Sequence, residues 1–165
     1  MLAEERRKQI AKRLESYPYY SYLKMNWLWF DALSETEGQA CIAMPFFSAL
    51  ANLDTGLHGG ATASLIDTGN NLALLTVTEA GDHLTLIQLN INYLAPVTKG
   101  TVLVLARDLR IGHRVVYGYA EVFNIPDEPL RPGNELEYEA LKNKMQESSP
   151  IAVSQDTYWV GKRPR

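Results

Sequence analysis

The chain has 165 residues, of which 46% are hydrophobic and 21% charged, and its formal net charge is −3. This composition is typical of one globular domain, and it lacks the basic excess that would indicate a nucleic-acid partner. The single cysteine, Cys41, and three scattered histidines exclude a disulfide framework and give no metal-ligand spacing, so we expect a reducing, cytoplasmic location and no metal or cofactor.

The N-terminal segment favours a helix over residues 3–16, with acidic residues before basic ones. We interpret it as a solvated amphipathic helix rather than a nucleic-acid or membrane binder, and residues 1–22 as an N-terminal helical extension. The tyrosine-rich stretch from Tyr17 to Tyr22 ends this helix. Its aromatic rings suit packing at the edge of the domain, or alternatively the lining of a ligand channel.

Runs of β-branched and aromatic residues predict six strands, at 24–33, 39–44, 84–94, 101–111, 115–123 and 151–160. In the third strand, alternation puts Leu84 and Leu86 on one face and Thr85, Ile87 and Leu89 on the other. Short turns between strands imply an antiparallel sheet. The segment 126–149 has a different composition and is interpreted as an insertion with a helix from Glu135 to Gln146.

The stretch from Asn52 to Thr78 is a glycine-rich turn followed by an apolar segment of helical length. A helix that is apolar around most of its circumference belongs in a core, so we predict a central helix over about 58–78 wrapped by the antiparallel sheet, an α+β fold.

On a helical wheel a narrow polar stripe is formed by Gly60, Ser64, Asp67 and Asn71. The opposite face of the helix carries small residues. A buried carboxylate must be paired, solvated or protonated. Two glycines at a helix start leave backbone amides bare, with the positive end of the helix dipole behind them. Amides near a carboxylate are suited to polarising and attacking a carbonyl, although ordinary turn chemistry gives the same local pattern.

A family resemblance is carried by ten residues, in chain order Asn52, His58, Gly59, Gly60, Asp67, Asn90, Tyr93, Pro96, Gly100 and Gly112. In this spacing the chain resembles the PaaI-like hot-dog-fold thioesterases, of the acyl-CoA thioesterase 13 type, over roughly residues 50–124 and 151–160. The resemblance implies that residues 1–165 form a single hot-dog domain, an antiparallel sheet around one long central helix, with 126–149 as an addition that caps the acyl channel, mediates assembly or decorates the surface.

The resemblance further implies hydrolysis of an acyl- or aryl-acyl-CoA thioester without a cofactor. The Gly59 amide would polarise the carbonyl, and Asn52 would shape the pocket or hold the attacking water. Asp67 would act as general base or, alternatively, as nucleophile through an anhydride. The site is implied to lie between two subunits, with Asp67 facing Gly59 of a partner, in a homodimer that pairs into a homotetramer; neither nucleic acid nor membrane is an expected partner.

The chain departs from the related thioesterases at a hydroxyl-bearing residue that would lie near Asp67, and it offers two candidates for that hydroxyl. Relatives often carry Ser or Thr four residues before the position of Asn90, where this chain has Leu86. Thr85 is adjacent but belongs to the opposite face of a regular strand, unless a bulge intervenes. Thr68, directly after Asp67, is the other candidate hydroxyl.

The remaining candidates concern substrate binding and His58. Gly60, Ser64, Thr85, His113 and Arg114 are expected to contact substrate, the last two as a basic rim for the phosphates of CoA, unless they are ordinary surface charges. His58 either orders the turn or does acid–base work. Apolar candidates for the acyl group, or for the core, are Trp27, Trp29, Phe46, Phe47 and Leu50.

Two other functions are compatible with the same fold. A non-catalytic acyl-CoA-binding or assembly module is favoured by the missing strand hydroxyl. A hot-dog dehydratase is disfavoured, because the central helix lacks the catalytic histidine of that class.

Overall fold

The computed structural model describes residues 2–111, 114–125 and 135–162. In chain order the elements are α1 (Glu4–Glu15), α2 (Pro18–Tyr22), β1 (Asn26–Ser34), β2 (Glu37–Pro45), a 3₁₀ turn (Ser48–Leu50), α3 (Gly59–Val77), β3 (His83–Tyr93), β4 (Thr101–Ile111), β5 (Val115–Ile125), α4 (Glu135–Glu147) and β6 (Ala152–Gly161).

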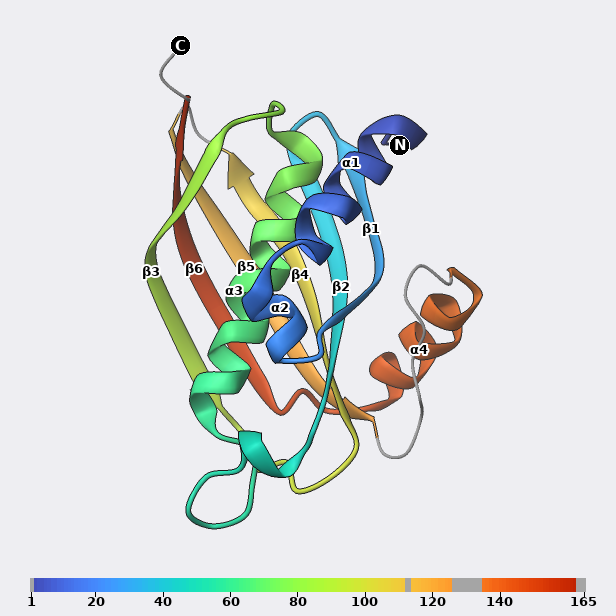
Figure 1. Cartoon of the computed structure of the whole chain (residues 1–165), viewed down its shortest axis with the longest axis vertical. Helices are drawn as coiled ribbons and strands as arrows, with labels where there is room; N and C mark the ends of the chain where they lie inside the picture. Colours follow the sequence, from blue (N-terminus) through green and yellow to red (C-terminus); the bar gives the residue numbers. More distant parts are fainter. Residues whose placement is uncertain (1, 112–113, 126–134, 163–165) are drawn as a thin grey trace.

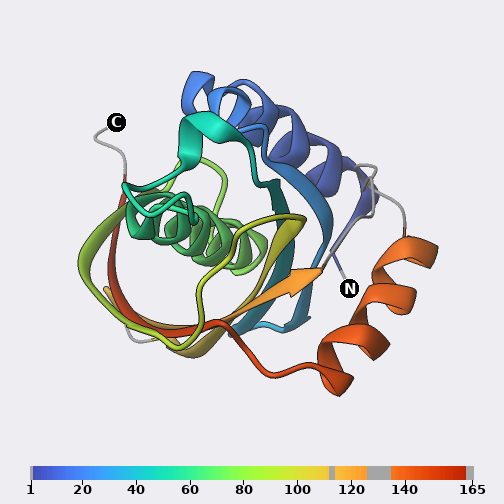
Figure 2. The same cartoon turned by 90° about the horizontal axis from the view of Figure 1, so that it is seen from below.

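The strands form one antiparallel sheet in the order β1-β2-β4-β5-β6-β3. The sheet curls around α3, while α1 and α2 lie on the open side of the curve and α4 lies outside it (Figure 1, Figure 2). The predicted α+β fold, an antiparallel sheet wrapped around a long central helix, is confirmed.

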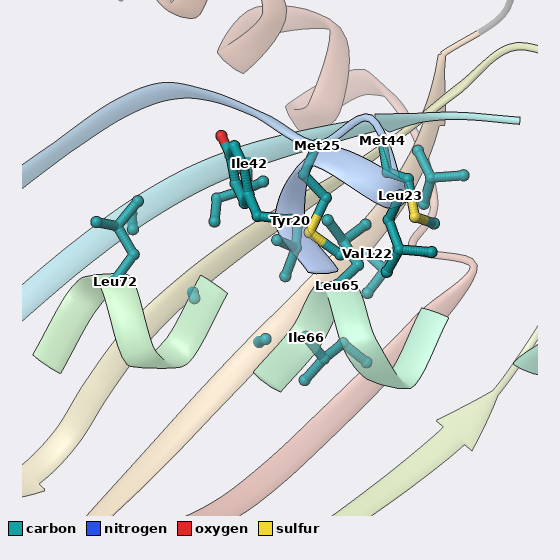
Figure 3. Packing of buried hydrophobic residues seen from close by; sticks show 14 of the residues in the cluster. Tyr20, Leu23, Met25, Ile42, Met44, Leu65, Ile66, Leu72 and Val122 are labelled. Carbon is teal, nitrogen blue, oxygen red and sulfur yellow. The ribbon is translucent and has the colours of Figure 1, made fainter. Parts of the chain in front are cut away.

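The helix α3 is buried along most of its length because its apolar side chains fill the curve of the sheet. Leu65, Ile66 and Leu72 have no solvent exposure, and Figure 3 shows Leu65 and Leu72 on the side of α3 toward Ile42 of β2. At Gly69 an added Cβ would lie 2.8 Å from Cγ1 of Val104 on β4, closer than real Cβ contacts come. The small face of the helix therefore lets the sheet approach closely.

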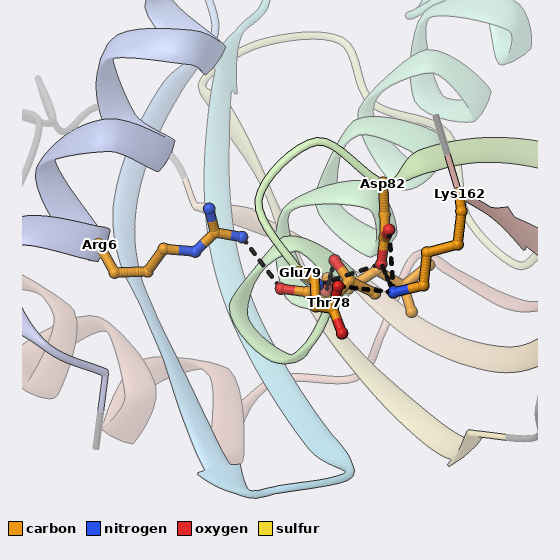
Figure 4. A network of polar contacts seen from close by, with 6 residues as sticks. Arg6, Thr78, Glu79, Asp82 and Lys162 are labelled. Carbon is orange, nitrogen blue, oxygen red and sulfur yellow. Dashed lines mark hydrogen bonds and ion pairs between the residues drawn. The ribbon is translucent and has the colours of Figure 1, made fainter. Parts of the chain in front are cut away.

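The N-terminal helix α1 is packed against this core through buried Ile10 and Leu14. It also supplies a hydrogen-bond donor to carbonyl groups at the C-terminal end of α3. Nη2 of Arg6 donates to the carbonyls of Leu75 at 3.1 Å and Thr78 at 3.0 Å (Figure 4). A cation at the C-terminal end of a helix complements the helix dipole. The predicted amphipathic helix thus has one face on α3.

The helix α4 covers part of the outer face of the sheet. The rings of Trp29 and Tyr138 stack 4.8 Å apart, and Leu28, Leu103 and Leu141 are buried around them. Trp29 therefore packs under α4 on the face opposite α3. The predicted helix from 135 is present, whereas residues 126–134 of the predicted insertion lie outside the described residues.

Two local features differ from the sequence predictions. Strand β3 has an irregular register between Leu86 and Gln88, so Leu89 and Ile91 lie on the same, partly buried face as Leu84 and Leu86, and the predicted alternation is wrong beyond this bulge. The tyrosine-rich segment forms the short helix α2, because Pro18 suits the first turn of a new helix even as it ends the old one.

Candidate active site

The start of α3 leaves one backbone amide without an acceptor. His58 is the N-cap of the helix, and its Nδ1 accepts a hydrogen bond from the Gly60 amide at 2.9 Å. Within the described residues the Gly59 amide has no acceptor. The predicted pair of bare amides is therefore a single one at Gly59, and His58 orders the turn by capping the helix.

The loop before α3 is organised by Asn52. Its side-chain oxygen accepts hydrogen bonds from the amides of Asp54 at 2.9 Å and Gly56 at 3.0 Å, and its own amide donates to the Gly56 carbonyl at 2.7 Å. This Asx-type turn holds Thr55 at a positive φ of 65°. Asn52 is exposed, and its side-chain NH₂ group makes no hydrogen bond within the described residues.

Tyr93, at the end of β3, ties this strand to the first residue of α3. Its hydroxyl donates to the Gly59 carbonyl at 2.9 Å, and its ring atoms lie 3.3–3.4 Å from the position that a Gly59 Cβ would occupy. Tyr93 belongs to the motif that carries the family resemblance, but its local sequence does not predict this contact.

The carboxylate of Asp67 lies two turns into α3 and is partly buried. Its Oδ1 accepts hydrogen bonds from the hydroxyl of Tyr158 on β6 at 2.8 Å and from Nδ2 of Asn71 at 2.9 Å. Burial raises the pKa of Asp67 above its usual value, and the two hydrogen bonds act in the opposite direction. Asp67 is thus a carboxylate with raised basicity and no cationic partner among the described residues.

The hydroxyls on the polar stripe are bound to the helix itself. Ser64 donates to the Gly60 carbonyl at 2.9 Å and contacts the hydroxyl of Tyr19 at 2.8 Å, and Thr68 donates to the Ser64 carbonyl at 2.7 Å. Both protons are therefore engaged, and the Ser64 oxygen in turn accepts from the Tyr19 hydroxyl.

The bulge in β3 changes the position of Thr85. Thr85 pairs with Trp159 and Asn90 pairs with Gln155, two positions that share one face of β6. One extra residue therefore brings Thr85 to the face of Asn90, and the side chain of Thr85 is exposed there. Arg114 is exposed at the start of β5, whereas His113 lies outside the described residues.

The spacing along α3 separates the two central groups within one chain. Gly59 and Asp67 are eight residues apart, which at the helical rise is about 12 Å. A substrate carbonyl that accepts a hydrogen bond from the Gly59 amide is therefore out of reach of Asp67 in the same chain.

Behind Tyr158, a row of buried polar groups crosses the sheet under α3. Asp108, Gly118 and Asp156 are neighbours on β4, β5 and β6, and Asn70 of α3 packs its amide against Gly118 and donates to Asp156. Burial raises the pKa of Asp108 to about 8 and that of Asp156 to about 7. Both carboxyl groups are buried, with exposed fractions of 3% and 2%. At neutral pH Asp108 is therefore mostly protonated, and Asp156 is about half protonated.

Sequence reasoning missed Tyr158 as the partner of Asp67. The available signal was polar residues at alternate positions of an apolar strand, because Ser154, Asp156 and Tyr158 all face inward from β6. In the described parts of the chain, no three His, Cys, Asp or Glu side chains gather as metal ligands would, and no helix is long and apolar enough to cross a membrane.

Comparison with known proteins relates this chain to thioesterases. The family model of the thioesterase superfamily matches residues 56–131, which include the start of α3, Asp67 and strands β3 to β5. A protein of Saccharolobus solfataricus, named provisionally as an esterase, is 36% identical over 80 residues, which are 48% of this chain and 56% of that protein. The match thus spans about half the length of this curated relative.

Solved structures share the fold over nearly the whole chain. The PaaI protein of the phenylacetic acid degradation operon of E. coli superposes with a TM-score of 0.72 at 17% identity, covering 96% of this chain and 95% of that one. The thioesterase HI1161 of Haemophilus influenzae gives 0.66 at 22% identity, covering 93% and 89%. These findings confirm the hot-dog fold, which the chain shares with PaaI, and the family-model match confirms the resemblance to the thioesterase superfamily over residues 56–131.

The protonated row predicts a particular pH dependence of stability. Because the folded-state pKa of Asp108 is above its unfolded value, its contribution to stability is complete below about pH 4 and is lost as pH rises through about 8, by up to about 1.4 kcal/mol per unit. Asp108→Asn keeps the shape but cannot ionise. We expect its melting temperature to exceed that of the wild type increasingly between pH 5 and 8.5.

The matched control is Asp54→Asn in the exposed loop, which should follow the wild-type curve. Parallel curves for the wild type and Asp108→Asn would contradict a protonated Asp108.

Proposed function

We propose that this chain, which has the hot-dog fold and matches the thioesterase superfamily over residues 56–131, hydrolyses an acyl- or aryl-acyl-CoA thioester to a free acid and CoA. The observation that carries the proposal is that α3 holds two groups, a Gly59 amide without an acceptor among the described residues and a partly buried carboxylate, Asp67, with a raised pKa. A thioester needs no more than this, because its carbonyl is already activated and a thiolate is a good leaving group.

The two groups meet when two chains associate. Strand β3 is an edge of the sheet, so a second copy can pair with it antiparallel and continue the sheet. A twofold axis there also sets the two α3 helices antiparallel, with Asp67 of one chain beside Gly59 of the other. The distance of about 12 Å within one chain supports this shared site. A homodimer is thus the smallest active unit, and two dimers would form the tetramer.

The proposed reaction begins with the thioester oxygen at the Gly59 amide. Water attacks the carbonyl carbon while Asp67 takes its proton, the oxyanion is stabilised by the amide and the helix dipole, and the C–S bond then breaks to release the thiolate of CoA. Attack by Asp67 itself would give an anhydride that water hydrolyses, with the same balance of atoms. Asn52, in the loop that leads into α3, would hold the water or the carbonyl.

The other substrate contacts are assigned by position. Gly60 and Ser64 line the start of the polar stripe, and Thr85 shares the face of Asn90 on β3. Arg114, with His113, would meet the phosphates of CoA. Thr85 lies on the exposed face of β3, whereas Leu86 lies opposite Tyr158 on the face toward Asp67, so β3 brings no hydroxyl to Asp67 and a non-catalytic acyl-CoA-binding module remains the second candidate function.

The first test is thiol release from acyl-CoAs of varied chain length and from aryl-acyl-CoAs. We expect the wild type to hydrolyse at least one of them, with kcat/KM falling as pH drops through the raised pKa of Asp67. Asp67→Asn should lower kcat at least about 100-fold and retain acyl-CoA binding. Binding without turnover for every compound would instead establish the module.

A second test isolates the Gly59 amide. Gly59 is the first residue of α3, a position that accepts proline, and His58 before it is extended at φ −65° and ψ 132°, as a residue before proline requires. Gly59→Pro deletes the N–H, so we expect kcat to fall about 100- to 1,000-fold in the same assay.

Gly59→Ala is the control, because it adds a Cβ against Tyr93 but keeps the amide. It should retain most of the activity. Equal losses in both variants would show that crowding, not the amide, matters.

A further inference from the structure

The contacts of Asp67 are unequal at its two oxygens. Tyr158 and Asn71 both donate to Oδ1, at 2.8 Å and 2.9 Å, and the described residues supply no hydrogen bond to Oδ2. The donors come from different elements, β6 and α3 itself, so together they fix the plane of the carboxylate.

Tyr158 is suited to a fixed orientation. It is fully buried, and it packs with Leu74 and Val116. Burial and the neighbouring carboxylates raise the pKa of its phenol, so Tyr158 stays a neutral donor throughout the working pH range. Its hydroxyl is also within 3.3 Å of the Asp67 carbonyl, which anchors it to the same residue.

We propose that Tyr158 is a positioning residue, which with Asn71 holds Oδ1 of Asp67 and leaves Oδ2 to act on the substrate. The role rests on the proposed thioesterase function, because it is defined by the reaction of Asp67. Tyr158 lies 91 residues from Asp67 in the sequence, in a strand whose other inward-facing residues belong to the interior of the fold.

The surrounding charges define what removal of the hydroxyl should do. Asp67 is the one charged residue of α3; Asp156 faces it from β6 and Asp108 lies beyond on β4. The Asp67 charge helps to raise the pKa of Asp156, whereas the Tyr158 hydrogen bond lowers the pKa of Asp67 itself. Loss of the hydroxyl therefore leaves burial less opposed, and the pKa of Asp67 rises.

The experiment is Tyr158→Phe, read in two ways. Carbon-13 NMR of labelled aspartate side chains, assigned with Asp67→Asn and Asp156→Asn, follows each carboxyl separately. We expect the titration of Asp67 to move up by about one unit, as for loss of a hydrogen bond to a charge. In the thiol-release assay the acid limb of kcat/KM should move by the same amount, kcat should fall about tenfold at the plateau, and KM should change less than about twofold.

Two further variants distinguish a specific effect on Asp67 from a general loss of structure. Asn71→Ala, on a partly exposed part of α3, removes the other donor and should shift Asp67 in the same direction. Tyr20→Phe removes a buried hydroxyl that has no partner among the described residues and should shift neither reading.

The outcomes separate this proposal from the proposed function. An unchanged Asp67 titration in Tyr158→Phe overturns the positioning role, whatever the activity. A shifted titration with an unshifted acid limb also overturns it, because Asp67 is then not the reacting group. If the wild type hydrolyses no thioester, the proposed function fails, and a full carbon-13 shift then still supports the hold of Tyr158 on Oδ1.

Discussion

The burial of one long helix inside a curled antiparallel sheet is the constraint on which the rest of this molecule depends. The helix packs closely against the sheet because Gly69 lets β4 come within van der Waals distance. Arg6 stabilises it by donating hydrogen bonds to its C-terminal carbonyls. Once α3 is fixed, its first amide and its carboxylate are fixed too, at a separation of about 12 Å that the backbone cannot shorten. Under the proposed function, the helix therefore carries two groups of the site that cannot meet within one chain.

Burial also sets the chemistry of the polar groups. Removing Asp67 from water raises its pKa, which makes it a better base near neutrality, and the hydrogen bonds from Tyr158 and Asn71 limit that rise. Asp108 and Asp156 lie deeper and are protonated more readily. The interior thus tolerates three carboxyl groups under one helix because the two deeper ones need not be charged at the same time as Asp67.

Much of the fold was predictable because the signals are local. β-branched runs gave β4 its bounds, 101–111, and the apolar helical stretch gave α3 to within one residue at each end. The polar stripe also placed Asp67 beside Asn71, four residues along. The bulge in β3 was not predictable from alternation, since one extra residue reverses the faces beyond it. The partners of the site residues were missed for another reason: Tyr158 meets Asp67, and Tyr93 meets Gly59, through pairings between distant segments that no local pattern specifies.

The central claim is that each site combines Gly59 of one chain with Asp67 of another. Complementation between two inactive variants tests this claim most directly. Mixing the Gly59→Pro and Asp67→Asn chains, with denaturation and joint refolding or by co-expression, produces mixed dimers in which one site has both defects and the other has none. Each variant alone should be nearly inactive, and a 1:1 mixture should regain about a quarter of the wild-type rate of thiol release. A mixture as inactive as its components, with mixed dimers shown to be present, would contradict the shared site.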